Sequence, residues 1–188
     1  MSTEEPKLRI GTITGSLRKG SFSRVLAESL PALSGADIEI SEMPTVGALP
    51  LFDQDLLDED GVPQTVADLA EAVRAVDGLI IVSPEYNWSI PGALKNALDW
   101  LSRLESKPTV DKPVTIFTCS PGLLGGARAH PPIRNVLHAL DCRILARPEV
   151  QISNVKAKIA PNPSRLTDLS TAEFVTQRIA AFAEFVRA

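Results

Sequence analysis

The sequence predicts an α/β protein: an open, doubly wound parallel sheet of five strands in the order 2-1-3-4-5, with helices on both faces. Short Val/Ile-rich runs alternate with stretches whose apolar residues recur at helical spacing. The run at 78–82 is continuously apolar, which is typical of a central parallel strand covered on both sides. The length of 188 residues suits one domain over 1–188, with a mobile tail expected at 1–6.

The first third of the chain predicts two strands and one helix. Residues 8–13 form the first strand, and 38–40 alternate as expected of an edge strand with one wet face. The helix between them buries Phe22, Val25, Leu26 and Leu30. Residues 43–61 are rich in Pro, Asp and Gly and predict a long loop with a short helical turn around 54–57.

The middle of the chain continues the alternation. A helix begins near Pro63, and the strand at 78–82 follows it. Another helix comes after Gly92, before a second buried strand at 114–118. The inward positions are Val66, Leu69, Ala70 and Val73 in the first helix and Leu94, Ala97, Leu98 and Leu101 in the second.

The last third predicts two helices and the fifth strand. One helix turns Ile133, Val136, Leu137 and Leu140 inward. The strand lies at 143–147, with an extension at 150–152 left open, and residues 153–169 show no clear period. The residues Ser-Thr-Ala-Glu at 170–173 match a capping box that opens an amphipathic closing helix.

Composition excludes several classes of protein. The net charge is −4 and Lys and Arg are scattered, so no basic face for nucleic acid is expected. No apolar run approaches the roughly twenty residues that span a bilayer, and the polar start is unlike a signal peptide. We therefore expect a cytoplasmic protein without a membrane partner.

Cysteine and histidine are too sparse for a disulfide framework or a metal site. Cys119 and Cys142 lie far apart in the sequence and are expected to be reduced thiols in or near the core. His130 and His138 are eight residues apart and lack a matching carboxylate pattern. No bound metal is expected.

The stretch from Thr14 to Ser23, between the first strand and the first helix, has the composition of a phosphate-binding loop. Gly15 and Gly20 permit close approach and unusual backbone angles, and the helix directs its positive end toward the loop. The loop also offers the hydroxyls of Ser16, Ser21 and Ser23 and the forked cation of Arg18. The glycine spacing fits neither the dinucleotide fingerprint nor a P-loop. An ordinary strand-to-helix turn is the alternative.

Two later loops, at 83–92 and 120–128, also depart from ordinary turn chemistry. They follow the strands predicted to be third and fourth. In a 2-1-3-4-5 sheet these loops and the first one are neighbours at the carboxyl edge, where such folds bind ligands. One pocket can therefore use all three.

Three motifs resemble one family. The segments at 15–23, 84–87 and 92–100 are similar to those of the NADPH-dependent FMN reductases, closest to their chromate and quinone reductase branch. The resemblance implies a flavodoxin-like fold and a bound FMN that NADH or NADPH reduces. It further implies a quinone, flavin, azo compound or chromate as acceptor, and a homodimer or homotetramer.

The resemblance also implies roles for particular residues. Ser16, Arg18, Ser21, Phe22 and Ser23 would hold the phosphate and ribityl end of FMN. Pro84, Glu85, Tyr86 and Asn87 would edge the isoalloxazine ring, and Ser120, Gly122 and Gly125 would border its pyrimidine side. No catalytic side chain is required, because the flavin N5 carries the chemistry.

Several alternatives stay open. Glu85 is either a proton carrier or a capping group, and Arg128 meets the nicotinamide phosphate, a neighbouring subunit or its own loop. Trp88 is interpreted as a packing or interface residue, and Lys95 and Asn96 as makers of structural hydrogen bonds. Pro131 and Pro132 stand where the resemblance implies a run of charged or aromatic residues. If subunit contacts in the family use this segment, the departure puts a tetramer in doubt. The rival functions are an electron carrier without its own NAD(P)H turnover and a flavin-dependent regulatory binding protein.

Overall fold

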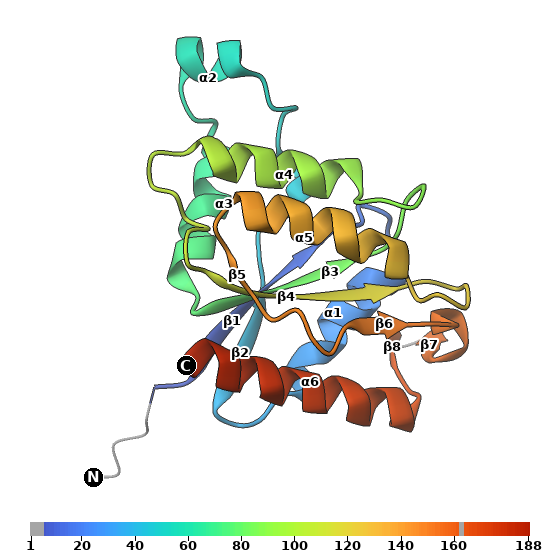
Figure 1. The fold of residues 1–188 in the computed structure, drawn as a ribbon. Coiled ribbons are helices and arrows are strands. Elements are labelled where there is room, and N and C mark those ends of the chain that lie inside the picture. The colour runs from blue at the N-terminus through green and yellow to red at the C-terminus, as the bar shows by residue number, and fades with distance from the viewer. Residues whose placement is uncertain (1–5, 162–163) are drawn as a thin grey trace.

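A parallel sheet forms the centre of the structure (Figure 1). The computed structural model describes residues 6–161 and 164–188; of the tail expected at 1–6, residues 1–5 lie outside the described residues. The strands are β1 (Leu8–Thr14), β2 (Ile38–Glu42), β3 (Gly78–Ser83), β4 (Pro113–Cys119), β5 (Arg143–Ile144) and β6 (Val150–Ile152). They lie in the order β2-β1-β3-β4, with both β5 and β6 paired in parallel to β4. The predicted order 2-1-3-4-5 is confirmed, with the fifth position shared by two segments.

Helices cover both faces of the sheet, as predicted (Figure 1). One layer contains α3 (Gln64–Ala75), α4 (Gly92–Arg103) and α5 (His130–Ala139), and the other contains α1 (Phe22–Leu33) and α6 (Leu169–Arg187). Successive strand residues alternate between the two cores: Ile81 packs with the first layer, and Ile80 and Val82 pack with the second. β3 and β4 are buried at every position, so they are the central strands that their apolar runs predicted.

The segment at 43–61 contains more helix than predicted. A 3₁₀ turn spans Val46–Ala48, and α2 spans Gln54–Asp60 rather than a single turn at 54–57. The Asp53 side chain caps α2 by accepting a hydrogen bond of 2.9 Å from the backbone N–H of Asp55. Leu56 and Leu57 pack partly against the core of the α3, α4 and α5 layer, which stabilises a helix too short to form alone.

The fifth strand is shorter than predicted and is interrupted. Only Arg143 and Ile144 of the predicted strand at 143–147 pair with β4. Pairing resumes in β6, where Val150 lies beside Phe117, so the extension at 150–152 is confirmed as a separate strand. Pro148 lies between the two segments and has no N–H to donate to a sheet, which accounts for a break in this region.

The predicted capping box at 170–173 is wrong. Helix α6 begins at Leu169, and its N-cap is Asp168, whose carboxylate accepts a hydrogen bond of 2.9 Å from the backbone N–H of Thr171. The hydroxyls of Ser170 and Thr171 donate to the same oxygen at 2.9 and 2.5 Å. Asp caps helices as well as Ser does, and here its position places the helix start two residues earlier.

The segment at 153–169 contains an antiparallel hairpin that the sequence did not predict. It is formed by β7 (Ile159–Pro161) and β8 (Ser164–Leu166), after a 3₁₀ turn at Val155–Ala157. The backbone N–H of Leu166 donates to Ser29 Oγ on α1 at 3.1 Å. The hairpin is therefore fixed by a contact with a distant part of the sequence.

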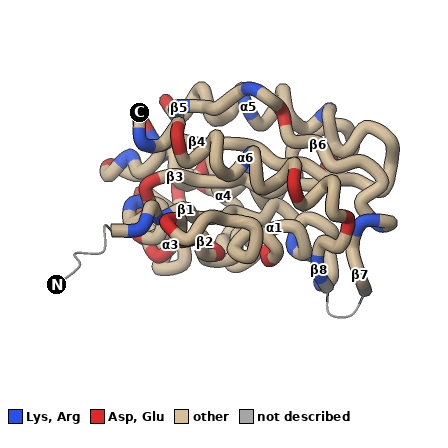
Figure 2. Tube along the Cα trace, turned by 90° about the horizontal axis from the view of Figure 1, so that it is seen from below, with Lys and Arg blue, Asp and Glu red and all other residues tan. Residues whose placement is uncertain are grey.

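The cysteines are free thiols, as expected. Cys119 is buried and Cys142 half-buried, and burial raises the pKa of each to about 12. Among the described residues, no cluster of His, Cys, Asp and Glu could hold a metal ion. Over the same residues, every helix is too short or too polar to cross a membrane. Lys and Arg positions are interspersed with Asp and Glu positions along the chain (Figure 2).

Candidate functional site

A cavity of about 200 Å³ lies where the loops after β1, β3 and β4 meet. Nine predicted site residues line it: Ser16, Arg18, Ser21, Phe22, Ser23, Pro84, Glu85, Tyr86 and Ser120. Cys119 and Pro121 also line it, although sequence reasoning did not single them out as site residues. The structure therefore brings the three loops together at the carboxyl edge of the sheet, where open parallel sheets bind ligands.

The loop after β1 has the backbone geometry expected of an anion cradle. Gly20 adopts a φ of 65°, which side chains rarely tolerate. Gly15 has a different constraint, because a Cβ there would lie 2.9 Å from Ser83 Oγ on the neighbouring strand. Glycine at these two positions lets the loop turn tightly and stay against β3.

Three serine hydroxyls are gathered at the N-terminus of α1. Ser16, Ser21 and Ser23 are each at most 3% exposed, and all three line the cavity. Ser21 is the N-cap of α1: its Oγ accepts from the backbone N–H of Arg24 at 3.1 Å and lies 3.3 Å from Ser23 Oγ. A helix N-terminus lined with hydroxyl donors favours an anionic ligand group.

One cation adds to the hydroxyl donors at this end. The guanidinium of Arg18 lies 5.8 Å from the centre of the Phe22 ring, at the cavity wall. The donor set of this cradle fits the phosphate of a cofactor such as FMN.

Tyr86 links the first and second loops. Its hydroxyl lies 3.1 Å from Ser16 Oγ. Its backbone exchanges hydrogen bonds of 3.1 and 2.9 Å with Ser89 across a two-residue turn, whose central residues Asn87 and Trp88 have φ values of 49° and 65°. Asn87 lies in this exposed turn and does not line the cavity, so its predicted contact with the ring stays a prediction.

Glu85 joins the second loop to the third. Its side chain is only 15% exposed, and its Oε2 accepts a hydrogen bond of 2.9 Å from the backbone N–H of Arg128. The Arg128 guanidinium lies 3.9 Å from Oε1 and sits 4.5 Å from the centre of the Trp88 ring. Of the alternatives left open, the structure shows Glu85 capping the turn at 127–129, and Arg128 held between a carboxylate and an aromatic face.

The glycines of the third loop do not border the cavity. Gly125 has a φ of 59°, and a Cβ there would lie 2.8 to 2.9 Å from the backbone atoms of residues 151–153. Its lack of a side chain therefore serves packing against β6 rather than the approach of a flat ligand. Gly122 is exposed, and its carbonyl accepts hydrogen bonds from Ser120 Oγ at 3.3 Å and from the backbone N–H of Asn154 at 3.1 Å.

Asn96 and Lys95 make structural bonds, as expected. Asn96 accepts from the backbone N–H of Phe52 at 2.7 Å and donates to the carbonyl of Pro50 at 2.8 Å. Lys95 pairs with Asp99 one turn along α4 at 2.7 Å. The two Asn96 bonds hold the segment before α2 against α4, and the Lys95 pair lies within α4.

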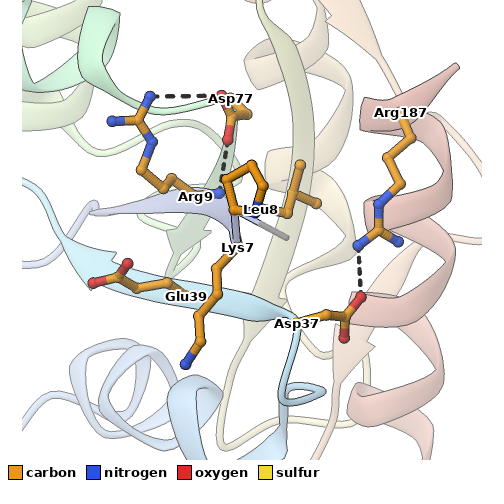
Figure 3. Close-up of a pocket in the computed structure, with 8 residues that line it drawn as sticks. Lys7, Leu8, Arg9, Asp37, Glu39, Asp77 and Arg187 are labelled. Atoms are coloured by element: carbon orange, nitrogen blue, oxygen red, sulfur yellow. Dashed lines mark hydrogen bonds and ion pairs between the residues drawn. The ribbon is translucent and has the colours of Figure 1, made fainter. Parts of the chain in front are cut away.

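A larger groove of about 900 Å³ lies at the opposite, amino edge of the sheet (Figure 3). Arg187 pairs there with Asp37 at 2.6 Å, and Arg9 lies 3.8 Å from Asp77. None of the predicted site residues lines this groove. The candidate site is therefore the smaller cavity.

The family model described as NADPH-dependent FMN reductase matches residues 8–157, a range that includes all three loops. The chain belongs to the NADPH-dependent FMN reductase family. Membership of this family makes the chain a flavin-linked oxidoreductase, in agreement with the resemblance of its motifs.

Individual proteins of known name match almost the whole chain. The chain is 43% identical over 181 residues to a quinone reductase from Escherichia coli strain K12, with 96% of each chain covered. It is 36% identical to an NAD(P)H-dependent FMN reductase from Pseudomonas aeruginosa, again with 96% of each covered. Among solved structures, the flavoenzyme NAD(P)H:(acceptor) oxidoreductase FerB from Paracoccus denitrificans superposes with a TM-score of 0.86 at 29% identity, covering 96% of this chain and 97% of that one.

Proposed function

We propose that the cavity binds FMN, that NADH or NADPH reduces it, and that a quinone is the electron acceptor. The observation that carries this proposal is the convergence of the serine-rich anion cradle with the loops after β3 and β4 in one cavity. The relatives named quinone reductase and FMN reductase support the choice of acceptor and reductant.

Each loop has a distinct task in this proposal. Ser16, Ser21, Ser23 and Arg18 hold the phosphate, and Phe22 flanks it. Pro84, Glu85 and Tyr86 edge the ring on one side, and Ser120 edges it on the other. The cavity is smaller than the roughly 300 to 1,000 Å³ typical of sites that enclose such ligands, so part of the ring faces outward, where nicotinamide and acceptor can reach it. The bound flavin supplies the hydride chemistry, and the protein positions it.

The first experiment is an absorbance spectrum of the purified protein mixed with FMN, followed by anaerobic addition of NADPH. We expect flavin binding, bleaching by NADPH and steady-state NADPH oxidation with a quinone. An electron carrier would bind flavin but show little turnover without a reductase. A protein that takes up no FMN and never oxidises NADPH or NADH contradicts the proposal.

A variant tests the anion cradle directly. Arg18→Gln removes a cation from the cavity wall, and a charge-assisted hydrogen bond contributes about 1.5 to 3 kcal/mol, so the Kd for FMN should rise roughly 10- to 160-fold. Lys19→Gln is the matched control, since Lys19 is exposed, has the same charge and does not line the cavity. Equal Kd values for the two variants would place the phosphate elsewhere.

We also propose that the protein assembles as a homodimer or homotetramer. Leu17, Trp88, Leu123 and Leu124 are large apolar side chains on the three site loops, and each is at least 51% exposed. Exposed apolar groups gathered at one edge of a monomer indicate an interface. Light scattering coupled to size exclusion is expected to give a mass above the 20.2 kDa of one chain, and a monomer at micromolar concentration would refute the assembly.

A further inference from the structure

Glu85 and Arg128 form a charge pair at the wall of the cavity. The Glu85 carboxylate lines the cavity and is 15% exposed, and the Arg128 guanidinium lies 3.9 Å from it. Charges that are shielded from water act on a neighbouring ligand more strongly than exposed ones do, so Glu85 should act more strongly than Arg128, whose side chain is 48% exposed. A ligand in this cavity therefore lies beside one fixed negative charge, with a positive charge just behind it.

The pair is held in place from both sides. The backbone N–H of Arg128 donates to Glu85 at 2.9 Å, which fixes the carboxylate independently of the guanidinium. The face of Trp88 holds the guanidinium at 4.5 Å from the ring centre. Among the described residues, this guanidinium donates no hydrogen bond, so Trp88 and Glu85 determine its place.

Trp88 occupies a backbone conformation that favours glycine. Its φ is 65°, in a two-residue turn of the kind that usually carries Asn-Gly. Its side chain is 69% exposed, so burial in the core does not account for a large aromatic residue there. Backbone strain of this kind concentrates at functional sites, and within one chain the Trp88 ring lies against the guanidinium of Arg128, in addition to the subunit interface proposed above.

We propose that Glu85 and Arg128 set the reduction potential of the bound flavin by opposing electrostatic effects, and that Trp88 positions Arg128 for this role. The proposal rests on the proposed function, because it requires FMN in this cavity. A bound flavin would accept a hydride on two-electron reduction, and its reduced form would then carry more negative charge than the oxidised form unless it also took up a proton. A carboxylate beside the ring disfavours that form and lowers the potential, whereas a guanidinium favours it and raises the potential.

The test measures the midpoint potential of the flavin-loaded protein by equilibration with redox dyes. Glu85→Gln keeps an oxygen that accepts from the Arg128 N–H but removes the charge, so the potential should rise. Arg128→Gln keeps that backbone N–H and removes the opposite charge, so the potential should fall. Arg128→Lys should stay near the wild-type value. Trp88→Leu should shift the potential in the same direction as Arg128→Gln, by a smaller amount.

The ion pair in the groove at the amino edge supplies matched controls (Figure 3). Asp37→Asn and Arg187→Gln remove the same charges from a pair that bonds at 2.6 Å far from the cavity. Both should leave the potential close to that of the wild type. If Glu85 and Arg128 have only a structural role, Glu85→Gln and Arg128→Gln should not shift the midpoint potential in opposite directions.

Failure of this inference and failure of the proposed function give different results. If Glu85→Gln and Arg128→Gln bind FMN but shift the potential in the same direction, or by no more than the controls do, the inference is wrong while the proposed function stands. If the wild-type protein binds no FMN, the proposed function itself fails, and the inference fails with it.

Discussion

Gly20 and Gly125 both have positive φ values, yet they differ in their surroundings. A Cβ on Gly20 would meet no atom within 4 Å, whereas one on Gly125 would lie 2.8 Å from the backbone carbonyl carbon of Gln151. We expect Gly20→Ala to cost about 1 to 2 kcal/mol through its backbone angle alone. Gly125→Ala should cost more, because strand β6 cannot move aside without losing its pairing with β4.

Urea unfolding of the two glycine variants checks this difference. Gly92→Ala is the control, since Gly92 opens α4, has an ordinary φ and would place a Cβ in open space. Its stability should equal or slightly exceed that of the wild type. Equal losses for Gly20→Ala and Gly125→Ala would show that close packing against residues 151–153 contributes little.

His130 makes stability depend on pH. Its side chain is buried, with Nε2 3.1 Å from Thr118 Oγ1 and 3.3 Å from the carbonyl of Val150. Burial lowers its pKa below the ordinary value of 6.5. Above pH 6.5 both folded and unfolded states are neutral; as the pH falls below 6.5 the unfolded chain takes up a proton first, and stability drops until the pH reaches the folded-state pKa.

The measurement is the free energy of unfolding between pH 8 and pH 5 for the wild type and for His130→Gln. Glutamine does not titrate, so the free energy of unfolding of the variant should fall less steeply below pH 6.5 than that of the wild type. Glu149 and Arg134 act on His130 with opposite sign and are present in both proteins. Identical slopes in the two proteins would mean that His130 titrates alike in the folded and unfolded states.

At the scale of elements, the start of α6 depends on one carboxylate. Asp168 accepts hydrogen bonds from the Thr171 side chain and backbone and from Ser170, which lower its pKa below the ordinary value of 3.8. Asp168→Ala should therefore lower the urea midpoint, and Ser170→Ala should lower it less because Ser170 is not the cap. A larger loss for Ser170→Ala would restore the capping box that the sequence suggested.

Elements with a regular burial pattern could be predicted, and elements defined by distant contacts could not. The buried residues of α3 are the ones that its helical spacing predicted, and the full burial of β3 is what its continuous apolar run predicted. The hairpin of β7 and β8 has no period of its own, and it is attached to α1 through Ser29. The segment before Asp168 has no pattern from which to place a helix start, so the sequence predicts the N-cap at Ser170 rather than at Asp168.

At the scale of the whole molecule, the place of the site could be predicted but its exact lining could not. The strand order requires that the loops after β1, β3 and β4 be neighbours, and they are. Which loop residues face the cavity depends on contacts between loops. Gly125 faces β6 because residues 151–153 lie against it, and Cys119 lines the cavity because it is the last residue of β4, directly before the third loop.

Hydrogen exchange with and without FMN tests the whole arrangement. A ligand at 100 times its Kd stabilises the folded chain by about 2.7 kcal/mol. Amides that exchange by local opening respond where the ligand contacts them. We therefore expect added protection at 15–23, 84–89 and 119–122. The groove at the amino edge around Asp37 and Asp77 should show none beyond the global effect.

Riboflavin has the ring but no phosphate, so the same measurement with riboflavin separates protection at the ring end of the cavity from protection at the phosphate end. It should protect 84–89 about as well as FMN does and slow exchange at 15–23 less than FMN does, because the serine cradle and Arg18 then have the ribityl chain but no anion to bind. Equal protection of both segments by riboflavin would show that the loops close together through the Tyr86 to Ser16 contact, whatever the ligand carries. Protection concentrated at the amino edge would move the flavin to the larger groove and overturn the assignment of the site.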